Sequence, residues 1–186
     1  MNMQEKGFDS AIALERLKEG NKIYLNCSKG VGDISPQKRL ETSKNGQHPY
    51  AVIVSCSDSR VIPESIFSAG IGDLFVIRVA GNVIDKHQLG SIEYAAEHLG
   101  CRLVVVLGHT GCGAVAAARG QNSGFVKFIT DEIRLAIGAE ADAVKASALN
   151  VKQSVKRIKD LINIEGLLVT GALYHTESGT VDFFND

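Results

Sequence analysis

The chain has 186 residues, a formal net charge of -1 and a hydrophobic content of 45%. This length predicts a single domain with a substantial buried core, and the balanced charge argues against nucleic acid or an anionic membrane as a partner. The chain contains no Trp and only 6% aromatic residues, which disfavours nucleic-acid binding by base stacking. No apolar run approaches the length of a membrane span.

Residues 1–20 carry charged side chains throughout and lack an apolar stretch, so they do not resemble a secretory signal. The chain also has four cysteines. In a reducing compartment, cysteines are more often metal ligands or catalytic groups than disulfide partners. We therefore expect a cytoplasmic protein.

Helical periodicity over residues 11–25 predicts a first helix, which Asp9 or Ser10 can cap. The polar segment 26–50 predicts an extended or partly helical connection. Residues 1–46 therefore form an N-terminal helical arm that is poorly suited to stand alone. We expect it to pack on the main body or on a second subunit, with the partner subunit favoured.

Short apolar runs rich in β-branched residues predict four strands, at residues 51–55, 74–79, 102–108 and 167–173. These runs are continuous rather than alternating, which is typical of strands that are buried on both faces of a parallel sheet. Because a turn at 176–179 follows the last run, residues 180–184 are expected to pair antiparallel with 167–173.

Helical patterns lie between and after these strands, at residues 89–99, 114–119, 125–137 and 143–162. The predicted fold is therefore α/β. Its central sheet is mainly parallel, with four parallel strands and a C-terminal antiparallel strand, and helices flank it.

Two polar clusters follow the first and third of these strands. Cys56 lies in the run Ser-Cys-Ser-Asp-Ser-Arg, and His109 and Cys112 lie in the run Gly-His-Thr-Gly-Cys-Gly. Functional groups gather at the carboxyl ends of parallel strands. Two thiols and one imidazole form a three-ligand zinc set, and catalytic zinc sites keep the fourth position open. The sequence therefore predicts one Zn²⁺ per chain, bound by Cys56, His109 and Cys112.

Such a centre would activate water as a metal hydroxide near neutral pH. Because two thiolates donate more charge than histidines would, we expect a basic pH optimum. The start of the helix after Cys112 is expected to favour the thiolate form of that residue.

Asp58 and Arg60 lie beside the first ligand and suggest an enzyme. Asp58 can accept a hydrogen bond from the nucleophile and position it. Alternatively, it can occupy the fourth zinc position and switch the site off. Arg60 can hold Asp58 away from the metal through a bidentate pair.

Other interpretations of these residues are weaker. Lone buried cysteines are usually small core residues, but that does not explain their joint pattern with His109. A closed structural zinc site would require a fourth Cys or His ligand. A cysteine phosphatase would place the negative charge of Asp58 where a phosphate should bind. A non-enzymatic zinc protein has no need of Asp58 or Arg60.

The combined pattern resembles the β-class carbonic anhydrases. The matching residues are Cys56–Arg60, Gly72–Arg78 with Ala80–Asn82, Ser91–Ala95 and Gly108–Gly113. The resemblance is close over about residues 47–118, and it implies one β-carbonic-anhydrase-like domain over residues 1–186. It further implies zinc on the three predicted ligands, with Asp58 and Arg60 as the catalytic pair.

The resemblance also implies a pocket for carbon dioxide or bicarbonate, formed by Gln47, Phe75, Ala80, Tyr94 and Gly113. Gln47 and Phe75 would come from a neighbouring subunit, so a homodimer should be the smallest active unit, with a homotetramer as the larger alternative. No nucleic acid or membrane partner is implied.

The implied activity is the reversible hydration of carbon dioxide to bicarbonate and a proton by a zinc-bound hydroxide. A hydrolase of carbonyl sulfide or carbon disulfide on the same fold is the alternative, because its metal site would look the same in sequence. One subgroup of the family holds an inhibitory bicarbonate with a Trp and a Gly, at the positions that Ile53 and Ser55 occupy here. We therefore expect no such switch, and an open site at neutral pH.

Overall fold

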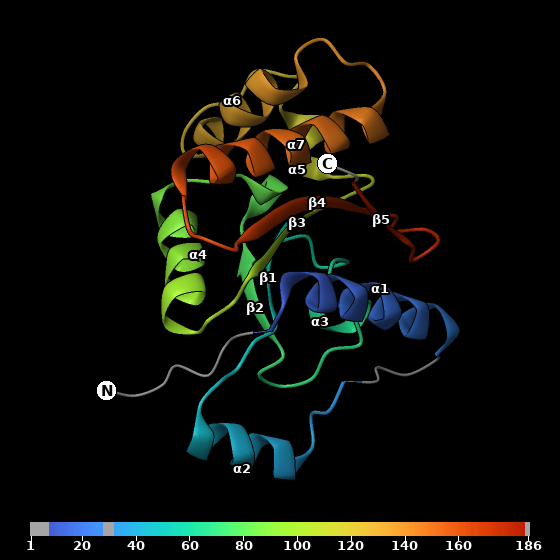
Figure 1. The fold of residues 1–186 in the computed structure, drawn as a ribbon. Helices are drawn as coiled ribbons and strands as arrows, with labels where there is room; N and C mark the ends of the chain where they lie inside the picture. Colours follow the sequence, from blue (N-terminus) through green and yellow to red (C-terminus); the bar gives the residue numbers. More distant parts are fainter. Residues whose placement is uncertain (1–7, 28–31, 185–186) are drawn as a thin grey trace.

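The computed structural model describes residues 8–27 and 32–184, which form a central sheet covered by helices (Figure 1). The strands lie in the order β2-β1-β3-β4-β5. The strand bounds are β1 Ala51–Ser55, β2 Leu74–Arg78, β3 Leu103–His109, β4 Leu168–Tyr174 and β5 Val181–Phe183. The first four strands pair in parallel and β5 pairs antiparallel with β4. The predicted fold class is confirmed.

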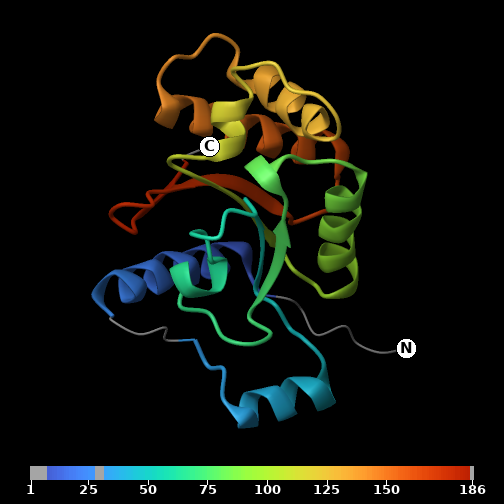
Figure 2. The same cartoon turned by 180° about the vertical axis from the view of Figure 1, so that it is seen from behind.

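The helices lie on both faces of the sheet and beyond one of its ends. Their bounds are α1 Ser10–Asn26, α2 Pro36–Asn45, α3 Pro63–Ile66, the 3₁₀ turn η1 Ala80–Asn82, α4 Lys86–His98, α5 Gly113–Ala117, α6 Val126–Ile137 and α7 Ala143–Leu161. One core cluster joins α1 and α3 to the sheet, and a second joins α4 and α7 to the opposite face. Both views show α1 beside α3, with α5, α6 and α7 grouped together (Figures 1 and 2). None of the helices that the structure describes is long and apolar enough to cross a membrane.

A third core cluster lies beyond the carboxyl ends of the strands, where α5, α6, α7 and η1 meet. Its members include Cys56 and Cys112, together with apolar side chains of the surrounding helices. The strongly amphipathic pattern of α6 directs Ile133 and Ile137 into this cluster. The cluster therefore surrounds the two predicted thiol ligands with packed apolar side chains.

The two helices of the N-terminal arm differ in how they pack. Ala13 and Leu17 of α1 are buried in the same cluster as Ile53 of β1, so α1 packs on the body of its own chain. In contrast, α2 has no buried residue. Contact of the arm with a partner subunit stays a prediction.

Sequence periodicity missed two short elements, α3 and η1, and placed the start of α4 too late. Asp85 caps α4 by accepting a hydrogen bond from the backbone N–H of His87, and Gln88 accepts one from the N–H of Asp85. This capping box starts the helix at Lys86, ahead of the apolar residues that carry the periodic pattern.

A buried amide holds α1 on the body. Asn21 is 6% exposed, and its Nδ2 donates to the backbone oxygens of Ile66 and Gly179 at 3.3 and 3.0 Å. Its Oδ1 accepts from the N–H of Val181 at 3.1 Å. One side chain therefore connects α1 to α3 and to the start of β5.

Replacing Asn21 with Ala should lower the free energy of unfolding by about 2–4 kcal/mol, because it removes two buried and one partly buried hydrogen bond and leaves their partners unsatisfied. Urea unfolding followed by circular dichroism measures this change. Asn26→Ala is the matched control, since Asn26 is exposed and its side chain donates to the backbone oxygen of Lys22 within α1; it should cost less than about 0.5 kcal/mol. Equal effects of the two substitutions would contradict the structural role of Asn21.

Candidate metal centre

The parallel pairing of β1 with β3 brings the two predicted ligand clusters together. Ser55 pairs with Leu107, so Cys56, directly after β1, and His109, the last residue of β3, lie at the same end of the sheet. Cys112 is the N-cap of α5. One potential ligand atom from each of Cys56, His109 and Cys112 lies within 4.8 Å of the others, and all three residues are buried. The predicted ligand set is therefore assembled at one point.

Two glycines shape this centre. Gly81 has a φ of 68°, its N–H donates to Cys56 Sγ at 3.2 Å, and a Cβ at this position would lie 2.6 Å from Ile133 Cδ1. Gly111, between the second and third ligands, also has a φ of 68°. Both positions require the left-handed conformation that glycine adopts readily.

The two thiols compete for protons. A hydrogen bond from the Cys112 thiol lowers the pKa of Cys56, against the effect of burial and with help from the Gly81 N–H. The pKa of Cys112 is raised, first by that same hydrogen bond and then by burial. Without a cation, the two sulfur atoms therefore share one proton near neutral pH.

The start of α5 acts on the Cys112 thiol in the predicted direction. The N–H groups of Val115 and Ala114 at the start of α5 do lower its pKa, but the neighbouring Cys56 outweighs them. A bound cation would stabilise both thiolates, since metal ligation deprotonates a coordinating thiol.

His109 is oriented for ligation through Nε2. Its Nδ1 lies 3.0 Å from the backbone oxygen of Thr110, which makes Nδ1 the protonated nitrogen. Its Nε2 is completely buried and has no hydrogen-bond partner in the described part of the chain. An unpaired buried nitrogen is costly, but its free lone pair, beside two thiols, suits a divalent metal that prefers sulfur and imidazole ligands. The residues therefore fit Zn²⁺.

Asp58 and Arg60 form the predicted bidentate pair. Arg60 Nε donates to Asp58 Oδ1 at 2.9 Å, and Arg60 Nη2 donates to Oδ2 at 2.7 Å. The same Nη2 also donates to the backbone oxygen of Gly111 at 3.1 Å. Asp58 Oδ2 lies 3.9 Å from His109 Nε2. The pair is therefore anchored to the ligand turn and places a carboxylate beside the metal ligands.

The Asp58 carboxyl is ionised at neutral pH. The hydrogen bonds from Arg60 hold the pKa of this carboxyl well below its usual range, more than compensating for burial, and His109 adds to the effect. Asp58 is thus a hydrogen-bond acceptor and not a proton donor at any pH near neutrality.

Sequence reasoning missed the contribution of Arg78. From the end of β2, its Nε donates to the backbone oxygen of Cys56 at 3.2 Å and its Nη2 to that of Asp58 at 2.8 Å. It therefore fixes the loop that carries the first ligand and the carboxylate. In the sequence, the signal for this role was a positively charged residue at the carboxyl end of a strand that lies beside β1.

The predicted pocket residues fall into two groups. Ala80 precedes the Gly81 that contacts Cys56, and Gly113 directly follows Cys112, so both adjoin the centre. Phe75, however, pairs with Val52, four residues before Cys56, or roughly 13 Å along the strand. Its own chain therefore does not place Phe75 at the metal ligands.

The remaining two predicted pocket residues are exposed. The ring of Tyr94, on α4, lies 6.2 Å from that of Phe75, and its side chain is 46% exposed. Gln47 precedes β1, at the opposite end of that strand from Cys56. Neither residue is assigned to the centre by the geometry of one chain.

Comparisons with known proteins agree with this geometry. The carbonic anhydrase family model matches residues 51–181. A carbonic anhydrase of Mycolicibacterium smegmatis is 35% identical over 193 aligned residues, which cover 91% of each chain.

Solved structures of β-carbonic anhydrases are also similar to this chain. The β-carbonic anhydrase of Aspergillus fumigatus has a TM-score of 0.71 and 30% identity, covering 94% of this chain and 90% of its own. A β-carbonic anhydrase of Sordaria macrospora, from a pair described as tetrameric, has a TM-score of 0.68 and 25% identity, covering 81% of this chain and 92% of its own. The chain belongs to the carbonic anhydrase family, in its β class, and is an enzyme of that family.

Proposed function

We propose that this enzyme catalyses the zinc-dependent, reversible hydration of carbon dioxide to bicarbonate and a proton. The observation that carries the proposal is the convergence of Cys56, His109 and Cys112 within 4.8 Å, beside a carboxylate that Arg60 keeps ionised. A donor set of two thiols and one imidazole favours zinc. Three ligands also leave a fourth position for the reaction.

The residues of the site would have separate roles in this reaction. Zinc on these three ligands would lower the pKa of water and so supply a nucleophile near neutral pH. Asp58, which can only accept hydrogen bonds at this pH, would orient that nucleophile. Arg60 would act through Asp58 as a positioning residue, because it contacts both carboxylate oxygens and the Gly111 carbonyl.

The alternative role of Asp58, as a fourth ligand that closes the site, is less well supported. Both of its carboxylate oxygens accept hydrogen bonds from Arg60, and its backbone oxygen accepts one from Arg78. Ligation of the metal would have to compete with these contacts. We therefore propose that the site is open at neutral pH.

We further propose a homodimer as the smallest active unit, with a tetramer as the larger alternative. Strand β2 is an edge of the sheet and is only half-buried, and α2 buries no residue on its own chain. A partner that covers these elements could supply Gln47 and Phe75 to a neighbouring centre, with Tyr94 beside Phe75. The tetrameric description of the Sordaria macrospora relatives is consistent with such assembly.

We also propose that the protein works in the cytoplasm. All four cysteines are free, and Cys27 is exposed. Exposed thiols persist in compartments where glutathione and thioredoxin keep them reduced. A metal centre that needs two thiolates has the same requirement.

Cys112→Ser should remove most of the bound zinc and lower the rate of carbon dioxide hydration at least ~100-fold, because the centre loses one of three ligands. Elemental analysis and stopped-flow hydration, from roughly pH 6.5 to 9, measure the two effects. Cys27→Ser is the matched control and should change neither.

The same assay separates the two substrate classes. Hydration that requires zinc and rises with pH would support the proposal. A zinc-loaded enzyme that does not hydrate carbon dioxide but hydrolyses carbonyl sulfide or carbon disulfide would assign the sulfur substrates instead.

Asp58→Asn should keep its zinc but lose about 10²–10⁴-fold in turnover, because the amide cannot replace the carboxylate as an acceptor on both oxygens. Metal content and kcat/KM are the measurements. Asp182→Asn, at the exposed position of β5, is the control and should retain full activity. Unchanged turnover in Asp58→Asn would indicate a metal centre without a catalytic carboxylate.

Arg60→Ala should raise the pKa of Asp58 toward its ordinary value of 3.8, because the hydrogen bonds that lower it are lost. The carboxylate is then protonated at a higher pH on acidification, but it stays ionised at pH 7 in both proteins. A loss of activity at pH 7, expected to be about tenfold or more, would therefore reflect misplacement of Asp58 and not its protonation.

Carbon-13 NMR of the Asp58 carboxyl against pH, together with hydration rates, tests this expectation. Arg60→Lys keeps the positive charge without the bidentate geometry, so it should retain part of the pKa shift and little of the activity. Full activity in Arg60→Ala would show that Arg60 does not position Asp58.

A further inference from the structure

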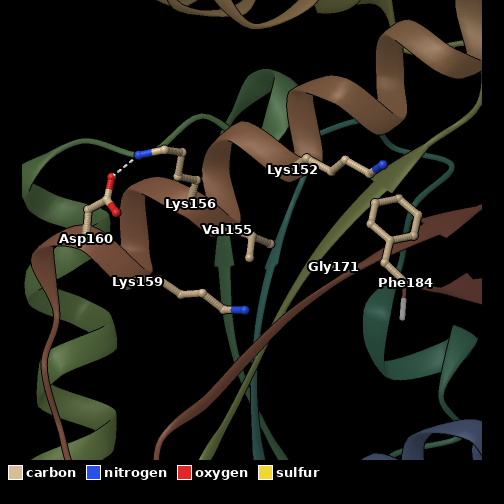
Figure 3. Close-up of a pocket in the computed structure, with 7 residues that line it drawn as sticks. All are labelled: Lys152, Val155, Lys156, Lys159, Asp160, Gly171 and Phe184. Atoms are coloured by element: carbon tan, nitrogen blue, oxygen red, sulfur yellow. Dashed lines mark hydrogen bonds and ion pairs between the residues drawn. The ribbon is translucent and has the colours of Figure 1, made fainter. Parts of the chain in front are cut away.

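A groove of about 340 Å³ lies between α7 and the end of the sheet where β4 and β5 pair (Figure 3). This volume falls in the range of small-molecule sites. The residues that shape it are Lys152, Val155, Lys156 and Lys159 of α7, Gly171 of β4 and Phe184 directly after β5.

Three lysines of α7 line the helix side of the groove. Lys152, Lys156 and Lys159 follow the helical spacing that places residues on one face, together with Val155. Lys156 is paired with Asp160 at 2.5 Å, and among the described residues that line the groove Asp160 is the acidic one. Within residues 8–27 and 32–184, no carboxylate forms an ion pair with Lys152. Lys152 therefore places a cation at the groove that no carboxylate of the described residues pairs with, and this favours an anion there.

The opposite wall is apolar and fixed in place. The N–H of Phe184 donates to the backbone oxygen of Gly171 at 2.8 Å, and Thr170 Oγ1 donates to the backbone oxygen of Phe184 at 3.3 Å. A Cβ on Gly171 would lie 2.7 Å from Phe184 Cδ2, so only glycine lets this ring lie against the strand. Lys152 Nζ lies 5.8 Å from the ring centroid, which places a cation beside the aromatic wall (Figure 3).

The groove is separate from the metal centre. Gly171 pairs with Val106, whereas His109 pairs with Tyr174, so the two positions differ by three residues, or roughly 10 Å, along the sheet. None of the groove residues is a metal ligand or a contact of Asp58.

We infer that this groove is a binding site for a small aromatic anion, such as an aryl phosphate or an aryl carboxylate. The ring of the ligand would lie against Phe184 and Val155, and its charged group would meet Lys152. Apolar contact and charge pairing together distinguish such a ligand from an inorganic anion, which can use only the lysines.

Titration of phenyl phosphate into the zinc-loaded, nitrogen-15-labelled full chain, followed by NMR, tests the inference. We expect the backbone amides of Gly171 and Phe184 to shift and saturate. Lys152→Gln should weaken this binding about three- to fivefold, as should raised salt, because an exposed charge pair is lost or screened. Lys145→Gln, on the same helix but outside the groove, is the matched control and should leave the affinity unchanged.

Inorganic phosphate and phenol should each bind more weakly than phenyl phosphate, since the first lacks the aromatic ring and the second lacks the charged group. The inference is overturned if phenyl phosphate shifts only amides around the metal ligands, or if Lys152→Gln and Lys145→Gln bind it equally. Equal affinity for inorganic phosphate and phenyl phosphate would also overturn it, because the aromatic wall would then contribute nothing.

Discussion

The structure depends on burying three polar ligand groups at one point. A buried donor or acceptor without a partner costs about 1–3 kcal/mol, and His109 Nε2 is such an atom. The Cys56 and Cys112 thiols are in a similar position, because they share one proton where two thiolates would be needed to bind a metal. A divalent metal such as zinc would remove both costs at once, so metal binding and the stability of this end of the fold would be coupled.

The helices at this end of the sheet support the centre through the η1 turn. Asn150 of α7 donates to the backbone oxygen of Gly81 at 2.8 Å, and Ser154 donates to that of Asn82 at 3.1 Å. The N–H of Gly81 in turn contacts Cys56 Sγ. A helix far along the chain therefore fixes the backbone that touches the first ligand, which is how outer contacts usually orient a metal site.

The parts that could be predicted from the sequence are those that local pattern controls. Continuous apolar runs such as Leu103–Leu107 indicate buried parallel strands, and the two polar clusters at strand ends identify the ligands. In contrast, η1 has little local signal, because its shape depends on close packing against Ile133 and on the hydrogen bond from Asn150. The coupling between the Cys56 and Cys112 thiols was likewise hidden, since the two residues are distant in sequence.

Pocket residues such as Phe75 show a different limit. The register of β2 with β1 places Phe75 well before the end of its strand, so a single chain cannot bring it to its own metal ligands. Its assignment to the pocket rests on the family resemblance and on a partner subunit. For such residues, sequence and one-chain geometry give the position in the sheet, and only the assembled enzyme can give the role.

Helix α7 combines two separable surfaces. Ser147, Asn150, Val151 and Ser154 are buried, and they face the η1 turn and the sheet, so changes there would disturb the metal centre. Lys152, Lys156 and Lys159 interleave with these residues on the outer side of the same helix. Because helical spacing keeps the two sets on different faces, the lysines contribute charge to the groove without supporting the centre. Affinity for an anion in the groove and zinc binding at the centre can therefore vary independently in this fold.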